Sequence, residues 1–127
     1  MRGLIVDYAG VLTDPDADEL YVELKALRER GIRTALLSNA PGASPSAKRS
    51  LEPFFDALVF SGEVGVAKPS REVYLLTAGL LSLPADQCVF VDDAARNVHG
   101  AVAAGMAGVH HTSVPGTLTE LSALFPA

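Results

Sequence analysis

The chain has 127 residues, 49% of them hydrophobic, and a single cysteine, so it can bury the core of one ordinary domain without an internal disulfide. Its formal net charge is −5 and it carries no Lys/Arg cluster, which argues against nucleic acid or an anionic membrane as a partner, because such binding needs basic side chains. No apolar run approaches the ~20 residues of a membrane span, so we expect one soluble, cytoplasmic domain over residues 1–127.

Short apolar runs alternate with stretches of helical periodicity along the chain. Four runs are expected to form buried strands and a weaker one a fifth strand, at residues 4–6, 35–37, 58–60, 89–91 and 107–109. Strands that alternate with helices are typical of successive βα units, in which the strands are parallel and helices cover both faces. The pattern therefore predicts an α/β fold with a parallel sheet.

The first helix is expected to begin near Asp16, because Asp16 and Glu19 have the spacing of a capping box, and to end at Gly31. The apolar positions on its inward face are Leu20, Leu24 and Leu27. A short second helix follows Pro45.

Two longer helices and a closing one are expected in the second half. The third helix begins around residues 69–70 and ends before Pro84, and the fourth runs from Asp93 to Gly105. A closing helix covers residues 117–124. The side chains expected to face inward on these three helices are Val73, Leu76 and Leu80, then Val98, Ala101 and Val102, then Leu118 and Leu121.

Polar side chains of the kinds used in phosphoryl chemistry follow the predicted strands in order. They are Asp7, Ser38 and Asn39, Lys68, and the pair Asp92 and Asp93. The carboxyl ends of parallel strands meet at one edge of a sheet, so these groups should converge on one crevice. Asp7, Ser38 with Asn39, and Lys68 are each better explained alone as turn formers or a solvated loop, and the acid pair is equally well explained as a helix start. Their succession favours an active site.

The chemistry that such a set supports is attack by a carboxylate on a phosphoryl group. Asp7 is the expected nucleophile, and a divalent cation held by Asp7, Asp92 and Asp93 must offset the repulsion between two anions. Hard oxygen ligands suit Mg²⁺. Lys68 would neutralise the phosphoryl oxygens, which the hydroxyl of Ser38 also binds. Asn39 would orient either the loop or the substrate.

Five other residues could attract a functional interpretation. Cys88 lies beside an apolar run and is expected to be a small core residue. The histidines His99, His110 and His111 are expected at the surface or in loops, and the last two point to opposite faces of a strand end, so they do not share a metal. Tyr8 either contacts substrate or packs.

Four segments carry a resemblance to a known family. DYAGVLTD, LLSNA, GVAKPSREVY and VFVDDAARNVHGAVAAGM resemble, in order and spacing, the four motifs of the haloacid dehalogenase-like superfamily. The resemblance implies a three-layer Rossmann-like fold with a five-stranded parallel sheet, Mg²⁺, and an aspartyl intermediate on Asp7. It also implies that the backbone carbonyl of Ala9 is a metal ligand, and it assigns Ser38, Lys68 and the acid pair to motifs II, III and IV.

Ala9 departs from the phosphatase pattern of that superfamily. Typical phosphatases carry there a second aspartate, which protonates the leaving group, and such general acid–base help is typically worth ~10²–10⁴ in rate. With alanine at this position, we expect phosphates with poor leaving groups to be cleaved slowly or not at all. The reaction with acyl phosphates should be slowed less. The DxAG segment from Asp7 to Gly10 is similar to that of phosphonoacetaldehyde hydrolases, but these use a Schiff-base lysine from a cap, and Lys25 and Lys48 fall in predicted surface helices.

No cap domain fits at either insertion position, since Thr13 is followed almost at once by a helix and residues 40–67 hold only a short helix and a strand. The site should be open to solvent unless a second subunit of a homo-oligomer covers it. The sequence thus favours a capless Mg²⁺-dependent hydrolase, phosphatase-type, with a phosphorylated or related anionic substrate. The rivals are a catalytically degenerate binding or regulatory protein and, lower, a phosphorylated receiver domain, whose acid pair comes first rather than last.

Overall fold

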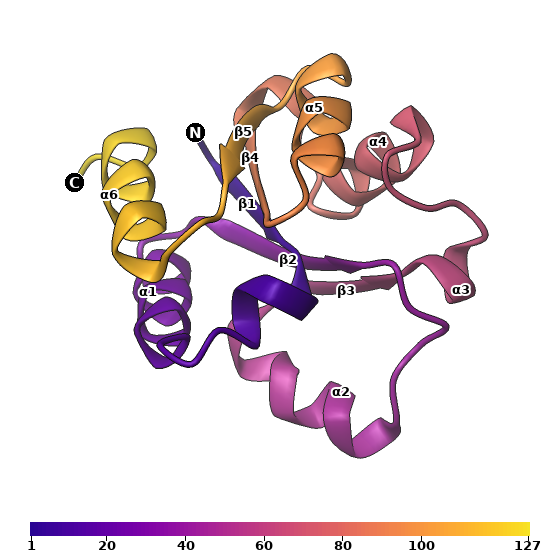
Figure 1. Ribbon diagram of the computed structural model, residues 1–127, viewed down its shortest axis with the longest axis horizontal. Coiled ribbons are helices and arrows are strands. Elements are labelled where there is room, and N and C mark those ends of the chain that lie inside the picture. The colour runs from indigo at the N-terminus through magenta and orange to yellow at the C-terminus, as the bar shows by residue number, and fades with distance from the viewer.

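The computed structural model describes residues 1–127 and is built on a five-stranded sheet with the order β3-β2-β1-β4-β5 (Figure 1). The strands are β1 (Gly3–Val6), β2 (Arg33–Ser38), β3 (Ala57–Phe60), β4 (Cys88–Asp92) and β5 (Ala107–His110). Every neighbouring pair is parallel, and Ile5 of β1 lies opposite Ala35 of β2 and Phe90 of β4. The predicted five-stranded parallel α/β fold is confirmed.

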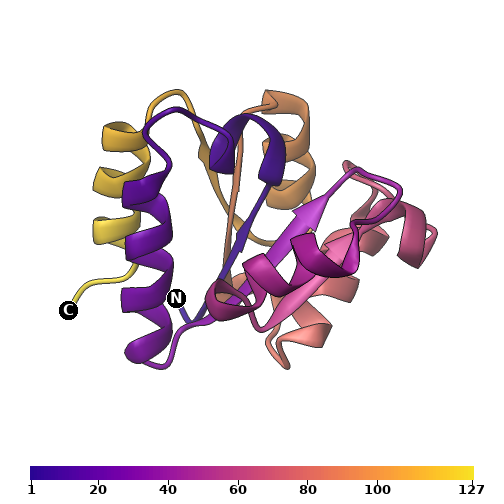
Figure 2. The same ribbon diagram turned by 90° about the horizontal axis from the view of Figure 1, so that it is seen from below.

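Helices cover both faces of this sheet and complete three layers (Figure 1). The helices are α1 (Asp18–Glu29), α2 (Pro45–Leu51), α3 (Ser61–Val64), α4 (Arg71–Leu80), α5 (Ala95–Ala103) and α6 (Val114–Leu124). Three shorter helical turns are η1 (Tyr8–Leu12), η2 (Glu52–Phe54) and η3 (Ala85–Gln87). Figure 2 shows α1 and α6 side by side on one face, and α4 and α5 pack together on the other.

The strands are apolar throughout because each contributes side chains to two separate cores. In β1, Leu4 and Val6 pack with α1 and α6, whereas Ile5 packs with α4 and α5. On the second face, the rings of Tyr74 and Phe90 meet edge to face with centroids 5.3 Å apart. Continuous apolar strands of this kind are what a parallel sheet buried on both faces requires.

The first helix starts later than predicted, and the predicted capping box is wrong. Helix α1 begins at Asp18 with Ala17 at its N-cap, and no side chain caps it. The backbone N–H of Asp16 instead donates to the carboxylate of Asp14 at 2.9 Å. The predicted inward leucines Leu20, Leu24 and Leu27 are all buried, and the chain leaves the helix at Gly31 with φ +86°.

For two side chains in the second half of the chain, the prediction that they face inward is wrong. Leu80 on α4 is 58% exposed and Val102 on α5 is 53% exposed. The other predicted positions on α4, α5 and α6 are buried or pack against the core: Val73, Leu76, Val98, Ala101, Leu118 and Leu121.

Two helix starts also differ from the prediction. Helix α5 begins at Ala95 rather than Asp93. Helix α6 begins at Val114, three residues early, because the Ser113 hydroxyl accepts from the N–H of Gly116 at 3.1 Å and caps it.

No domain is inserted between the core elements. The connection from β1 to α1 holds only η1, and the connections from β2 to α4 hold α2, η2, β3 and α3. The expected absence of a cap within the chain is therefore confirmed. None of the helices has the length and apolar character needed to cross a membrane.

Candidate active site

The sheet order places the two predicted acidic strand ends next to each other. β1 lies between β2 and β4, and the strand order changes direction between β1 and β4, which is where open α/β sheets bind ligands. Asp7 directly follows β1, and Asp92 is the last residue of β4. Both side chains are buried.

Lys68 joins these strand ends. Its ammonium Nζ donates to Asp7 Oδ1 at 2.8 Å and to Asp92 Oδ2 at 2.9 Å. The third hydrogen bond goes to the backbone carbonyl of Leu37 at 3.0 Å. With Lys68 only 4% exposed, the structure brings together three of the residues singled out in the sequence, in a buried ion triad.

The two carboxylates of this triad differ in electrostatic environment. Burial raises the pKa of Asp7 to about 6, although the hydrogen bond and the charge of Lys68 act to lower it. Burial also acts to raise the pKa of Asp92, but the hydrogen bonds from Ala94 and Lys68 outweigh it and hold the pKa below its usual value. The hydrogen bonds thus favour the carboxylate form more strongly at Asp92 than at Asp7, and Asp7 keeps one carboxylate oxygen free of other side chains.

A third carboxylate makes this cluster a candidate cation site. Asp7, Asp92 and Asp93 each have a carboxylate oxygen within 4.8 Å of those of the other two. Three carboxylates against one ammonium leave an excess of negative charge, and their hard oxygens are the ligands that Mg²⁺ prefers. The residues present therefore fit that ion. Ala9 lies in the η1 turn beside them, and the role of its carbonyl as a ligand remains a prediction.

Gly10 makes room for the exposed carboxylate of Asp93. Its φ is +84°, and a Cβ there would lie 2.1 Å from Asp93 Oδ2. Only glycine combines this backbone conformation with this contact. The backbone carbonyl of Asp93 also lies 2.9 Å from Nε2 of the exposed His110.

Asn39 holds the loop that carries Lys68. Its Nδ2 donates to the carbonyl of Lys68 at 3.0 Å, and its Oδ1 accepts from the backbone N–H of the same residue at 2.9 Å. Both ends of the amide are thus used on the backbone of one residue, which supports the loop-orienting alternative over contact with phosphate. Ser38, at the end of β2, is buried and lines a neighbouring cavity.

Sequence reasoning missed Asn97 of α5. Its Nδ2 donates to Asp92 Oδ2 at 3.1 Å, and its buried Oδ1 has no hydrogen-bond partner. The backbone carbonyl of Asn97 accepts from the hydroxyl of Tyr74 at 2.6 Å. A polar side chain on the inward face of a helix that directly follows the acid pair was the available signal.

His111 lies in the loop after β5, as one of the two expected alternatives had it, but it is 4% exposed and so does not lie at the surface. Its Nδ1 lies 2.7 Å from the hydroxyl of Thr117 and its Nε2 lies 3.1 Å from Asp14 Oδ2. It therefore ties the loop after η1 to α6. His99 is exposed, and Cys88 is fully buried in β4, as a core residue should be.

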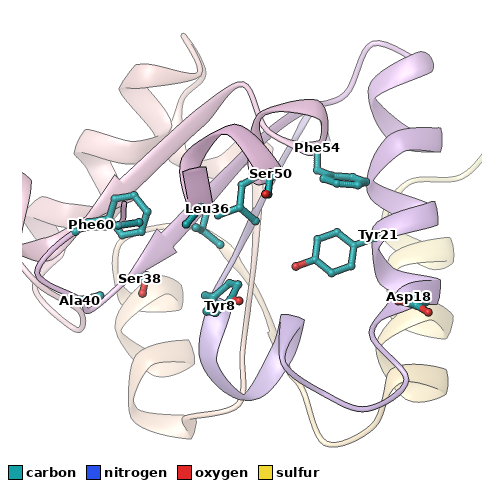
Figure 3. A pocket seen from close by; sticks show the side chains of 13 residues that line it. Tyr8, Asp18, Tyr21, Leu36, Ser38, Ala40, Ser50, Phe54 and Phe60 are labelled. Carbon is teal, nitrogen blue, oxygen red and sulfur yellow. The ribbon is translucent and has the colours of Figure 1, made fainter. Parts of the chain in front are cut away.

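An apolar cavity of about 710 Å³ includes Ser38 and Tyr8 among its lining residues (Figure 3). It lies between η1, α1, β2 and α2, and its walls include Tyr8, Tyr21, Leu36, Phe54 and Phe60. Tyr8 directly follows Asp7, so the cavity begins beside the expected nucleophile.

The fold and this rim define a class of protein. A Rossmann-like parallel sheet with a strand-end aspartate, a buried lysine and a pair of acids at its switch point is the layout of an enzyme with a carboxylate-rich active site. The family model described as haloacid dehalogenase-like hydrolase matches residues 4–105. The chain therefore belongs to the haloacid dehalogenase-like hydrolases, as its motifs suggested.

Solved structures share this fold. A crystal structure of an uncharacterized protein from Corynebacterium glutamicum is 41% identical, with a TM-score of 0.90, and the match covers 98% of this chain and 94% of that one. A family enzyme from Bacteroides thetaiotaomicron, solved with magnesium and inorganic phosphate, shares the fold at 20% identity with a TM-score of 0.62, over 76% of this chain and 53% of that one.

Curated relatives include phosphatases. Sesquiterpene phosphatase astK of Aspergillus oryzae is 31% identical over 80% of this chain and 53% of its own length. The phosphorylated carbohydrates phosphatase of Thermotoga maritima is 28% identical over 68% of this chain and 42% of its own length. The chain thus spans about half the length of these curated relatives, or less.

Proposed function

We propose that residues 1–127 form a core domain that hydrolyses phosphoric esters or anhydrides with Mg²⁺ and a phosphoryl-enzyme intermediate on Asp7. The observation that carries the proposal is the hydrogen bond from Lys68 Nζ to Asp7 Oδ1 at 2.8 Å, which fixes the carboxylate at the end of β1. The phosphatases among the relatives support the same class of reaction.

In the proposed reaction, a carboxylate oxygen of Asp7 attacks phosphorus while the bond from phosphorus to the leaving oxygen breaks. Water then cleaves the acyl phosphate, which releases inorganic phosphate and regenerates Asp7. The hydroxyl of Ser38 holds the phosphoryl oxygens, and the positive charge of Lys68 offsets their negative charge. Mg²⁺, when bound by Asp7, Asp92, Asp93 and the carbonyl of Ala9, supplies positive charge between the two anions.

Ala9 restricts the leaving groups that this site can expel. No side chain at position 9 can donate a proton, so an alkoxide would have to leave unprotonated. Aryl and acyl phosphates, whose leaving groups are weakly basic, are the expected substrates. The same residue keeps a second candidate open, a protein that binds Mg²⁺ and anions but turns over slowly and acts as a regulatory partner.

The DxAG segment does not lead us to propose phosphonatase chemistry. That reaction needs an amine free to form a Schiff base. The ammonium of Lys48 pairs with Glu63 at 2.7 Å, and that of Lys25 lies 5.9 Å from the centre of the Phe54 ring. Lys68 is held by the ion triad.

The test is hydrolysis of p-nitrophenyl phosphate, whose leaving group needs little protonation. We expect turnover that depends on Mg²⁺ and falls by about 10³-fold or more in Asp7→Asn, because the nucleophile is lost. Asp86→Asn, which removes an exposed acid in η3, is the matched control and should retain full activity. Turnover that persists without metal or in Asp7→Asn contradicts the mechanism.

A further inference from the structure

The cavity beside Asp7 has the size and lining of a small-molecule site. Small-molecule sites are typically about 300–1,000 Å³ and predominantly apolar, and this cavity measures about 710 Å³ with 9 hydrophobic residues among its 13. Figure 3 shows the aromatic rings of Tyr8, Tyr21 and Phe54 around one side and Phe60 on the other.

The cavity shares one residue, Ser38, with the proposed phosphoryl site. It does not include Asp7 or Lys68, but it reaches Tyr8 and Ser38. Tyr8 follows Asp7 in the chain, and Ser38 follows Leu37, whose carbonyl accepts from Lys68 Nζ at 3.0 Å. These two lining residues place the cavity next to the proposed phosphoryl site.

The charge of the lining excludes a second anionic group on the substrate. Asp18 is the only charged residue among the lining side chains, and it is negative. Lys48, on the lining helix α2, has its ammonium 5.5 Å from the centre of the Phe60 ring, but that ammonium is paired with Glu63 at 2.7 Å. No cation of the lining could neutralise a carboxylate or a second phosphate, and burying such a group unpaired is costly.

The aromatic side chains favour a ring as the bound group. Tyr21 and Phe54 meet edge to face with centroids 4.8 Å apart, and aromatic groups gain from further contacts of this kind. Tyr8 remains 40% exposed, so its ring is available to a ligand.

We propose that this cavity binds the leaving group of the substrate. The substrate class is then either the acyl phosphate of an aromatic carboxylic acid or the phosphate monoester of a phenol, in each case with no further charged group on the ring. The inference rests on the proposed function and adds its substrate class. The two features point the same way, because Ala9 requires a weakly basic leaving group and the cavity requires an apolar one. Benzoate and phenolate groups meet both requirements.

The experiment compares kcat/KM for benzoyl phosphate and acetyl phosphate with Mg²⁺. Both expel a carboxylate of similar basicity, so the ratio reports the apolar contact. Burying a phenyl ring corresponds to about a 10- to 100-fold preference for benzoyl phosphate.

Two variants on α2 then locate this preference. Ala47→Glu places a charge on an exposed residue that lines the cavity. Ser46→Glu places the same charge on the preceding residue, which does not line the cavity. Both lie in the first turn of α2, where an acid suits the helix equally. We expect the preference to fall to less than about threefold in Ala47→Glu and to persist in Ser46→Glu.

The outcomes separate this inference from the proposed function. If acetyl phosphate is hydrolysed in an Asp7-dependent way without preference for benzoyl phosphate, the function stands and the cavity has another use. If neither is hydrolysed, binding of phenylphosphonate and methylphosphonate with Mg²⁺ decides. A preference for the phenyl compound that Ala47→Glu removes supports the cavity, and equal binding overturns it. If Ala47→Glu changes only the sedimentation of the protein, the cavity is a subunit interface and the inference is wrong.

Discussion

Lys68 is buried with every donor of its ammonium in use. A lysine ammonium has three N–H groups, and here they reach Asp7 beyond β1, Leu37 in β2 and Asp92 at the end of β4. A buried charge is tolerated only when it is paired and hydrogen-bonded. One residue from a distant loop therefore fixes the carboxyl ends of three strands, and with them the position of the proposed nucleophile.

Ala9 offers a direct test of why the site needs good leaving groups. Ala9 is exposed, with φ −66° and ψ 128°, so an aspartate fits there without backbone strain. We expect Ala9→Asp to raise kcat/KM for a simple alkyl phosphate at least tenfold, toward the ~10²–10⁴ that general acid catalysis typically supplies. Ala9→Asn has the same size but no acidic proton to donate. Equal rates in the two variants would favour a binding role or different chemistry.

The sequence was sufficient to predict which strand-end residues meet, but not how each is held. Asp7, Lys68 and Asp92 converge because parallel strands end at one edge, and that rule needs only the strand assignments. The Leu37 carbonyl and the Asn97 amide could not be predicted in this way. Backbone carbonyls leave no trace in a sequence, and Asn97 is one of several polar residues on a helix whose rotation is set by packing.

At the scale of elements, helix starts were predicted less well than helices. Asp16 and Asp93 have the side chains of N-caps, but the Asp14 carboxylate takes the N–H of Asp16, and the Asp93 carboxylate lies at Gly10. Capping preferences describe a residue in isolation, and they fail where a side chain has another partner.

The buried face of α4 was predicted correctly at Val73 and Leu76 but not at the C-terminal end of the helix. Spacing of large apolar residues selected Leu80, but Thr77 and Ala78 are buried instead. The Thr77 hydroxyl donates to the carbonyl of Val73 at 2.7 Å, which lets a polar residue enter the core. A small or internally satisfied side chain gives little hydrophobic signal in the sequence.

Gly10 allows the η1 turn to be tested against a matched glycine. Gly10 and Gly31 have φ of +84° and +86°, but a Cβ meets Asp93 only at Gly10, and nothing lies within 4 Å at Gly31. Alanine at either position should cost about 1–2 kcal/mol in the free energy of unfolding from backbone strain. Gly10→Ala should in addition displace the Asp93 carboxylate and raise the Mg²⁺ concentration needed for half-maximal activity. Urea unfolding and a Mg²⁺ titration measure the two effects, and an equal Mg²⁺ requirement in both variants would remove Asp93 from the cation site.

At the scale of the whole molecule, the fold class was predictable and the strand order was not. Continuous apolar strands separated by helices demand a sheet buried on both faces, whatever its order. Several orders satisfy that demand, and the sequence pattern does not distinguish them. The observed order matters for function, because it sets β1 beside β4 and so brings Asp7 within reach of the acid pair.

The reactivity of Cys88 measures whether the central sheet stays folded. Its thiol lies in the central sheet against Gly3 and the carbonyl of Pro84, and burial raises its pKa to about 11. The thiolate needed for reaction with a disulfide reagent is therefore scarce, and the sheet must separate before the reagent can enter. With a typical domain stability of about 5–15 kcal/mol, we expect labelling of the native protein at pH 8 to be at least ~10³-fold slower than in denaturant.

A cysteine on the surface supplies the control for that measurement. Cys88→Ala combined with Ser122→Cys moves the only thiol to an exposed position on α6, where it should react as fast in the native as in the unfolded protein. If Cys88 itself reacted at that rate, β4 would have to open locally without unfolding of the domain. Asp92 at the end of the same strand would then move with it, and the ion triad around Lys68 could not be the fixed feature on which the proposed mechanism depends.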